Sequence, residues 1–523
     1  MKVALLSYGA EGLGLQYLSA VLKRNGHECQ LFFDPTLFDD KLLLHYPRLH
    51  RFFSAERWII DEIAAYAPNI FGIQILTDTF PWANRFARAI RHRLPAVTIV
   101  AGGTHVTILP ERVAEEPWYD YLVRGDGEFP MAKIAAAVSE GQRATDIPGV
   151  WTRMGDSWSK NELSPLEQDI AQFGVPDRSI YAPYVNTSKT HLAISSRGCL
   201  YACSFCHHNA QRKIYRGKGR YLRRLTPRQF VTQLREAFDL YQYQSLQIYD
   251  EIFTYDVEWL RAFVALYSKE VGVPYLCLGH PSCMSEEIVR LLKESGCFGI
   301  QIGIQSLNGE TRRQFLQRKE DNVTIHQMIA WFEQYDLPYQ PDMIFGLPGD
   351  TEADYVDAAI FFSHCHAAAK VNTLILSLQP QTDIVDHAIN SGFIQEADKE
   401  NIDSGKEGCR VGDSGSIRDQ KLFKRCQNYM LLFKIAVYTP SWVTMVLLRT
   451  RLFLILRFFE PFLGHAIRLW NIDQRDVQYV RHYGRYLTEF FYRKVTGRRL
   501  FGPVRLRPKT PVVPSGSLDG GPG

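Results

Sequence analysis

The chain has 523 residues, which is too long for one ordinary hydrophobic core, so we expect two to four domains. Apolar residues make up 46% and charged residues 22% of the sequence, which is the composition of a folded soluble protein. The net charge of +4 gives no general reason to expect a nucleic-acid partner. No apolar run reaches the roughly 18 residues of a membrane span, so no transmembrane segment is expected.

The first residues, MKVALLSYG, form a short apolar stretch that runs into a glycine-rich turn. Because the stretch has neither an apolar region of signal-peptide length nor a cleavage site, we interpret it as a strand and expect a cytoplasmic protein. The ten cysteines are then expected to be ligands or buried thiols rather than disulfides.

Residues 1–135 alternate short apolar strands with amphipathic helices, a pattern that predicts a parallel, doubly wound, Rossmann-like sheet. The expected strands are 3–9, 29–34, 69–76, 97–103 and 119–128, and the expected helices are 14–27 and 81–94. Such sheets bind ligands outside the carboxyl ends of their strands, and glycines there let a ligand approach the backbone. The residues at those ends are Gly12, Gly14, Thr77, Asp78, Gly102, Gly103, Thr104, His105, Gly125, Asp126, Gly127 and Glu128. Each turn taken alone is an ordinary strand-to-helix turn, whereas the four together favour a ligand site.

Residues 136–187 are expected to be a connector with a small hairpin arm at 147–153. A second alternation of strands and helices fills 188–390 and predicts a partial β/α barrel, with its site at the carboxyl ends of the strands. Its expected strands begin at His191 and continue at 245–251, 274–280, 297–306 and 338–349. The helix at 226–241 has Thr226 as its expected N-cap and Pro227 in its first turn.

Residues 391–505 read as a mainly helical, aromatic and basic region with a flexible loop at 404–420, and residues 506–523 as a disordered tail. The most apolar segment, 435–448, is interrupted by Pro440. Its length favours a core helix over an amphipathic helix that lies on a surface. The basic segment 212–224 is expected to be solvated or to close over substrate.

The sequence RGCLYACSFCHHN places Cys199, Cys203 and Cys206 in the loop after a strand, with C-x3-C-x2-C spacing. Three thiolates leave one iron of a [4Fe–4S] cluster open to bind a small molecule, which a cluster with four cysteines cannot do. Structural zinc needs four ligands, and His207 or His208 could supply the fourth, so zinc stays an alternative.

This cysteine spacing, with the aromatic Phe205 before the last cysteine, resembles the signature of radical S-adenosylmethionine (SAM) enzymes. The resemblance covers roughly residues 190–380 and implies that the open iron binds SAM and that reduction releases a 5′-deoxyadenosyl radical. It implies that Asp250 or Glu251, in YDE, holds the SAM amino group. It further implies that Gln305 and Ser306, in GIQS, approach the ribose and methionine, and that Asp342 lies near the adenine.

The segments AGGTHVTILPE at 101–111 and VRGDGE at 123–128 are similar to the cobalamin-binding domain that precedes many radical SAM barrels. This similarity implies cobalamin contacts from Gly12, Gly14, Thr77, Gly102, Gly103, His105, Gly125 and Glu128. The D-x-H-x-x-G motif that gives cobalt a histidine is absent, and GAEGLGLQ occupies its place. A purely structural Rossmann-like domain stays the alternative.

The family resemblance implies a cobalamin-dependent radical SAM methyltransferase that acts on an unactivated carbon, with a second SAM recharging the cobalt. The first rival is a non-methylating rearrangement, cyclisation or oxidation with the same cofactors, and the second is an iron–sulfur or zinc protein that binds or carries electrons. Expected partners are a small-molecule substrate and a one-electron reductant of the flavodoxin or ferredoxin type. The aromatic, basic C-terminal region suggests an apolar or lipid-like substrate and leaves peripheral membrane contact open. No residue is assigned a catalytic role in relaying or quenching the radical.

Overall fold

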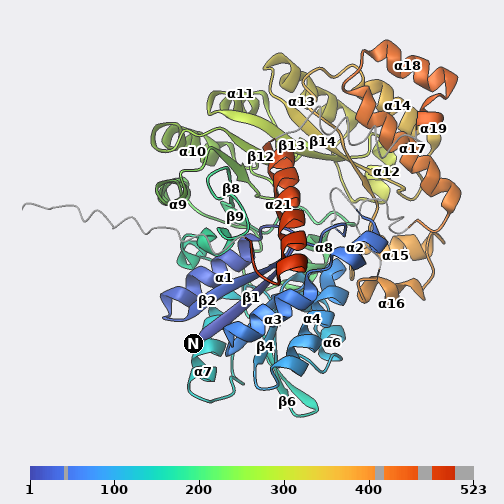
Figure 1. Cartoon of the computed structure of the whole chain (residues 1–523). Helices are drawn as coiled ribbons and strands as arrows, with labels where there is room; N and C mark the ends of the chain where they lie inside the picture. Colours follow the sequence, from blue (N-terminus) through green and yellow to red (C-terminus); the bar gives the residue numbers. More distant parts are fainter. Residues whose placement is uncertain (40–44, 407–416, 457–473, 501–523) are drawn as a thin grey trace, which may run out of the picture.

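Two parallel sheets in the computed structural model each form the centre of a domain, and a helical region follows them (Figure 1). The structure describes residues 1–39, 45–406, 417–456 and 474–500. The expected tail at 506–523 and most of the loop at 404–420 lie outside these ranges. The succession of an α/β domain, a β/α barrel and C-terminal helices agrees with the architecture predicted from the sequence.

The N-terminal sheet has the strand order β2-β1-β3-β4-β5-β6-β7, in which β1 to β5 run parallel. Its strand β1 is buried on both faces, because Val3 and Leu5 enter one apolar cluster and Ala4 and Leu6 the other. Helices α1 and α7 pack together, as do α3 and α4. The strands are β1 (Lys2–Tyr8), β2 (Glu28–Asp34), β3 (Ile70–Gln74), β4 (Thr98–Gly102), β5 (Tyr121–Val123), β6 (Val150–Met154) and β7 (Ser157–Lys160). The helices are α1 (Leu13–Arg24), α2 (Pro47–Phe53), α3 (Glu56–Tyr66), α4 (Phe80–Arg93), α5 (Thr104–Ile108), α6 (Pro110–Ala114) and α7 (Glu128–Ser139).

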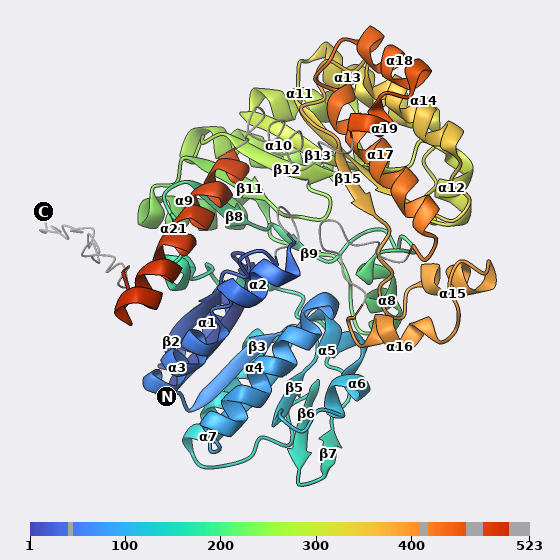
Figure 2. The same ribbon diagram turned by 45° about the vertical axis from the view of Figure 1, so that its right-hand side comes forward.

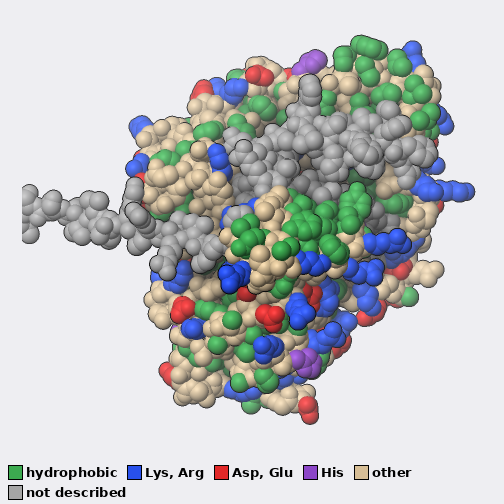
Figure 3. Space-filling view, in the orientation of Figure 1, with side chains coloured by type: hydrophobic (Ala, Val, Ile, Leu, Met, Phe, Trp, Pro, Cys, Tyr) green, Lys and Arg blue, Asp and Glu red, His purple; other side chains and the backbone are tan. Residues whose placement is uncertain are grey.

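Two features of this domain differ from the sequence-based expectation. The hairpin of the connector, β6 and β7, extends the first sheet, since β6 pairs antiparallel with β5. The segment between β2 and β3 forms two helices, of which α3 buries Ile59 and Ile63 against the sheet. Helix α2 lies on the surface, and Figure 3 shows hydrophobic side chains gathered over it.

The second sheet is parallel throughout, with the order β15-β14-β13-β12-β11-β8. Its six strands do not close on themselves, so the barrel is partial, as predicted. The strands are β8 (Thr190–Ala193), β11 (Ser245–Ile248), β12 (Tyr275–Gly279), β13 (Cys297–Gln305), β14 (Tyr339–Phe345) and β15 (Asn372–Ile375), and a short ladder joins β9 (Ser196–Arg197) to β10 (Arg223–Arg224). The sequence pattern did not show β15, whose four residues are only partly buried or exposed.

Helices on the outer face of this sheet complete the largest apolar cluster of the described chain. Helix α9 shows why they form: Thr226 and Gln229 make a capping box, Pro227 occupies the first turn, and Phe230 and Leu234 point into the core. The barrel helices are α8 (His207–Ile214), α9 (Pro227–Tyr241), α10 (Val257–Glu270), α11 (Glu286–Glu294), α12 (Gly309–Gln314), α13 (Asn322–Gln334) and α14 (Glu352–Phe362).

The C-terminal region packs on both domains. Helix α17 packs on α14 of the barrel, whereas α21 lies against the N-terminal domain, where Tyr486 stacks on Phe33 with ring centroids 5.6 Å apart (Figure 2). The helices are α15 (Asp383–Asn390), α16 (Asp398–Asp403), α17 (Gln420–Ala436), α18 (Ser441–Thr450), α19 (Phe453–Leu456) and α21 (Gln474–Thr496). None of the helices in the described ranges is both long and apolar enough to cross a bilayer.

The core placement expected for 435–448 holds for its first half and only in part for its second half. Pro440 interrupts the helical segment, because proline has no backbone N–H to donate to the carbonyl oxygen four residues earlier. Ile435 and Ala436 are buried at the end of α17, but α18 buries only Thr444 and exposes Trp442. Trp442 and Val446 of α18 therefore lie on the surface, whereas Leu447 and Leu448 pack against the barrel core.

Candidate functional site

The carboxyl ends of both sheets line one cavity of about 440 Å³. This volume lies within the range of small-molecule sites. The N-terminal domain contributes the ends of β1, β3, β4 and β5, which include the switch point between β1 and β3 where the strand order reverses. The barrel contributes residues that follow β8 and β11. Among the sequence-predicted residues, those that line the cavity are Gly14, Gly102, Gly103, Thr104, Gly125, Asp126, Gly127, Glu128 and Glu251.

Two of the glycines are required by backbone geometry as well as by space. Gly103 has φ +110°, and a Cβ there would lie 2.7 Å from the carbonyl oxygen of Ile75. Gly125 has φ +84°, and a Cβ there would collide with the hydroxyl of Tyr215. Any other residue at these positions would therefore be strained and would push into the wall of the cavity. This glycine-lined wall is a cradle that fits a ligand held close to the backbone, as a corrin ring would be.

Three residues expected to contact cobalamin lie outside the cavity lining. Gly12 donates its backbone N–H to the hydroxyl of Tyr181, at 3.0 Å. The His105 ring is fully buried, 4.6 Å from the ring of Phe80, and its Nδ1 lies 3.2 Å from Thr77 Oγ1. Burial lowers the pKa of His105 to about 4, so this side chain is a neutral core histidine at neutral pH.

Arg197 joins the two domains at the cavity wall. Its guanidinium lies 3.0 Å from Asp126 and 2.5 Å from Glu128, and the rings of Tyr17 and Phe173 lie 4.8 and 4.2 Å from it. Burial alone would lower the pKa of Arg197, but Glu128 and Asp126 raise it above its ordinary value. Because Arg197 precedes Cys199 by two residues, the ion pairs connect the N-terminal domain to the start of the cysteine loop.

Sequence reasoning missed Arg197 and the buried end of the segment 212–224. That segment was expected to be solvated or to close over substrate, and most of its residues are at least partly exposed, but Arg223 is buried and the Arg224 side chain is only 6% exposed. Arg223 lies 2.5 Å from Asp126, and Arg224 packs 3.4 Å from the ring centroid of Trp259. The available signal was the charge pattern, because the acidic residues of the VRGDGE turn need cationic partners, which Arg197 and Arg223 supply.

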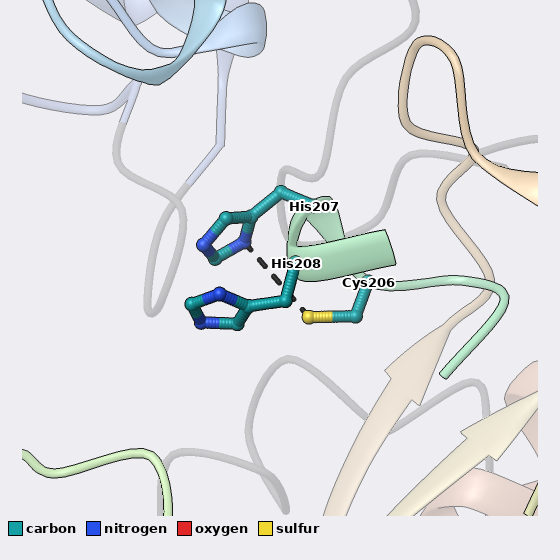
Figure 4. Close-up of side chains that lie close together, drawn as sticks. All are labelled: Cys206, His207 and His208. Carbon is teal, nitrogen blue, oxygen red and sulfur yellow. Dashed lines mark hydrogen bonds between the residues drawn. The ribbon is translucent and has the colours of Figure 1, made fainter. Parts of the chain in front are cut away.

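The three cysteines lie in the loop between β9 and α8, and Cys206 is the N-cap residue of α8 (Figure 4). Arg212 of that helix donates to the carbonyl oxygen of Cys199 at 2.8 Å, which ties the loop down. Burial raises the pKa of Cys199 to about 11. Burial, with smaller contributions from Glu251 and the other two thiols, raises the pKa of Cys206 to about 12. Three half-buried thiols in one loop are a donor set that suits an iron–sulfur cluster.

The zinc alternative finds little support in this geometry. Ligand atoms of Cys206, His207 and His208 lie within 4.8 Å of one another, and this compact group includes neither of the other two cysteines. A tetrahedral zinc with bonds of about 2.0–2.3 Å needs four ligands gathered around it. His208 is engaged elsewhere: its Nδ1 lies 2.6 Å from the Tyr221 hydroxyl, and its Nε2 lies 3.2 Å from Glu251.

The structure separates the two acidic candidates for the SAM amino group. Asp250 is fully buried and accepts the backbone N–H groups of Ser195 and Ser196 at 2.5 and 3.2 Å. Glu251 lines the cavity, and 44% of its side chain is exposed. Burial alone would raise the pKa of Glu251, but the neighbouring histidines lower it, so the carboxylate is ionised at neutral pH. Of the two acidic candidates, Glu251 is therefore the one whose carboxylate faces the cavity.

The remaining residues expected to contact SAM lie outside the cavity lining. Phe205 packs on the apolar cluster that contains Ile344, which positions the last cysteine of the loop. Gln305 ends β13 with φ +70°, and Ser306 Oγ accepts the N–H of Asn308 at 3.1 Å. Asp342 accepts from Gln301 at 3.0 Å and from Asn372 at 2.8 Å, which connects β13, β14 and β15.

Comparison with known proteins agrees with both halves of this arrangement. The model of the radical SAM superfamily matches residues 193–362, and the model of the B12 binding domain matches residues 3–135. The chain is 24% identical over 349 residues to the uncharacterized methyltransferase PH0819 of Pyrococcus horikoshii, an alignment that covers 64% of this chain and 72% of the relative. It is 22% identical over 293 residues to the anaerobic magnesium-protoporphyrin IX monomethyl ester cyclase of Synechocystis sp., which covers 53% of this chain and 56% of that one.

Two solved structures share the fold. The radical SAM methyltransferase TsrM from Kitasatospora setae, with cobalamin and a [4Fe–4S] cluster bound, superposes with a TM-score of 0.57 at 18% identity, over 74% of this chain and 78% of that chain. The cobalamin-dependent SAM radical enzyme OxsB, with aqua-cobalamin and SAM bound, gives a TM-score of 0.61 at 12% identity over 95% and 80% of the two chains.

The fold and the cysteine loop thus define a radical SAM enzyme. More specifically, the chain belongs to the radical SAM enzymes that carry an N-terminal B12-binding domain, and its cofactors are a [4Fe–4S] cluster, SAM and cobalamin. Enzymes of this kind need a one-electron reductant and a substrate.

Proposed function

We propose that this enzyme transfers a methyl group to an unactivated carbon of a small-molecule or lipid-like substrate. The observation that carries the proposal is the single cavity bounded by the glycine turns of the N-terminal sheet and by Glu251 of the barrel. When bound, SAM and the reduced cluster supply a radical that removes hydrogen from the substrate carbon, and cobalamin supplies the methyl group. Both cofactors must reach the same substrate, and a shared cavity allows this.

The residues of the chain have distinct tasks in this proposal. Cys199, Cys203 and Cys206 hold three irons of the cluster and leave the fourth open for SAM. Glu251 accepts the N–H groups of the SAM ammonium, and His208 fixes the Glu251 carboxylate from the opposite side, 3.2 Å away. Asp250 holds the backbone that leads into the cysteine loop, through the amides of Ser195 and Ser196.

On the opposite wall, the proposal places the corrin ring of cobalamin over the cavity-lining glycines Gly14, Gly102, Gly103 and Gly125. Apolar side chains that include Leu5 and Val100 complete this wall and keep water away from the reacting centre. No histidine is among the described residues that line the cavity, in agreement with the absence of the D-x-H-x-x-G motif from the sequence.

The test is anaerobic reconstitution of the full chain with iron, sulfide and cobalamin, followed by dithionite and SAM labelled in its methyl group. We expect 5′-deoxyadenosine, together with label retained on the protein-bound corrinoid. Formation of 5′-deoxyadenosine without any labelled corrinoid would contradict methyl transfer and favour the non-methylating rival, for which the cyclase relatives are the precedent. Absence of 5′-deoxyadenosine would contradict radical SAM chemistry altogether.

The proposed electron donor is a flavodoxin- or ferredoxin-type protein. Replacing dithionite by such a reduced protein in the same assay tests this, and we expect 5′-deoxyadenosine to form at a rate that falls with ionic strength, because such encounters are steered by charge. A rate that equals the protein-free background would contradict this choice of reductant.

A further inference from the structure

The most apolar exposed surface of the N-terminal domain lies on α2 and on the C-terminal half of α21. Its large apolar side chains are 44 to 85% exposed and belong to Tyr46, Leu49, Phe52, Phe491 and Val495. We call these five residues the α2–α21 patch. Single exposed apolar residues are ordinary, but a contiguous group of this kind on a folded protein marks an interaction site.

The patch is held on a rigid support. The rings of Phe53 and Phe490 lie 4.8 Å apart, those of Phe53 and Phe491 lie 5.8 Å apart, and Trp58 of α3 lies 5.2 Å from Phe490. Phe490 is only 4% exposed, so α21 is anchored by one buried ring while its neighbours face outward. The exposed side chains are therefore presented by packed helices rather than by a loose segment.

Cations outnumber acidic residues around the patch. Helix α2 contains Arg48, His50 and Arg51, and residues 490–500 contain four cations and no acidic residue. Two of those four, Arg493 and Arg499, form ion pairs with Glu62 of α3. Lys494 extends over the ring of Phe52, with Nζ 3.8 Å from the ring centroid, so its stem covers apolar surface while its charge stays outside. Figure 3 shows Lys and Arg side chains next to the hydrophobic group over α2.

A second apolar group occurs on α18 and α19, at Trp442, Val446, Leu452, Leu454 and Ile455, next to Arg449 and Arg451. The same view shows hydrophobic side chains over α18, so both groups are visible on one face (Figure 3). Of the nineteen large apolar side chains exposed within the described ranges, eleven lie within residues 46–53, 442–455 or 491–500.

We propose that this face binds the surface of a membrane that contains anionic lipids. Aromatic and aliphatic side chains would enter the boundary between headgroups and acyl chains, and the flanking arginines and lysines would bind lipid phosphates. Two separated apolar groups with cationic flanks on one face suit an extended planar surface better than a compact protein partner. The binding does not depend on the proposed reaction, because it uses residues outside the cavity and the cysteine loop.

The test measures partitioning of the full chain onto vesicles of phosphatidylcholine, with and without phosphatidylglycerol, by flotation. We expect binding only to vesicles with phosphatidylglycerol, and we expect added salt to weaken it. Replacing Arg48 and Arg51 by Gln should lower partitioning by about fivefold for each charge removed, since a basic residue near an anionic surface contributes about 1 kcal/mol. Leu49→Ser with Phe52→Ser should also lower it.

The matched control is Leu240→Ser with Val323→Ser, which removes two side chains that are 67 and 74% exposed on the barrel helices α9 and α13. The control should bind vesicles like the unmodified protein, and all variants should form 5′-deoxyadenosine at the same rate. The proposal is overturned if the unmodified protein ignores anionic vesicles, if patch and control variants lose binding equally, or if the patch binds an acidic protein such as flavodoxin and no vesicle.

Discussion

Removing the charge of Arg197 tests whether the N-terminal domain holds the cysteine loop through buried ion pairs. In Arg197→Met the side-chain stem remains, but Glu128 loses the guanidinium that lies 2.5 Å away, while Asp126 keeps Arg223 at the same distance. The Glu128 side chain is only 5% exposed, so its carboxylate becomes a buried charge without compensation. Breaking a buried pair in this way costs about 3–5 kcal/mol of unfolding free energy.

The double variant Arg197→Met with Glu128→Gln should recover most of that loss, because no uncompensated charge remains. Arg261→Met is the matched control, since Arg261 also has two carboxylate partners, Glu258 and Glu287, but lies on the surface, where ion pairs contribute little. Urea unfolding followed by circular dichroism compares the four proteins. The reasoning fails if Arg197→Met is no less stable than Arg261→Met, or if the Glu128→Gln change brings no recovery.

Three further predictions test the assignments in the cavity and the core. Glu251→Gln should raise the KM for SAM by about 10- to 100-fold with unchanged stability, since a charge-assisted hydrogen bond contributes about 1.5–3 kcal/mol. Asp250→Asn should mainly destabilise the fold. Equal stability of the two variants would contradict the separation of roles. A leucine at Gly127 would face the apolar wall of the cavity, so Gly127→Leu should weaken cobalamin binding by about 5- to 150-fold in a spectroscopic titration. A leucine at Gly484 would point into open space, so Gly484→Leu should leave the affinity unchanged. Equal affinities of the two variants would contradict the placement of cobalamin at this wall. The pKa of His105 is about 4 in the folded chain and 6.5 ordinarily, so the unfolded chain takes up a proton first as the pH falls. The contribution of His105 to the free energy of unfolding is therefore fully present above pH 6.5 and is lost as the pH falls toward 4. Between pH 7 and pH 5 the unmodified protein should therefore lose about 2 kcal/mol more than His105→Asn, and parallel pH profiles in urea unfolding would contradict the neutral, buried ring.

Local patterns in the sequence were sufficient to predict both sheets and the cysteine motif. Strand β1 was recognisable because it is buried on both faces, so its sequence is a run of apolar residues. Helix α9 was recognisable because its N-cap and the spacing of its apolar residues act within one or two turns. The C-x3-C-x2-C spacing is equally local. These features depend on neighbours in the chain, so they can be read without knowing what packs where.

Other properties depend on residues far apart in the sequence. Pro440 marks where the helix ends, but whether α18 is covered depends on the elements that pack beside it. The two acidic residues of YDE are adjacent and chemically alike, and only the amides of Ser195 and Ser196, some 55 residues earlier, decide that Asp250 is buried while Glu251 faces the cavity.

The amino-acid sequence by itself determined the class of enzyme and the order of the two domains, and it predicted the cluster ligands, because short-range spacing encodes each of them. Tertiary structure alone decided that His105 is a core residue, that Glu251 and not Asp250 faces the cavity, and that Arg197 bridges the domains. The physical reason is that burial and charge compensation are properties of the packed chain: a carboxylate or an imidazole acquires its role from the groups that surround it after folding.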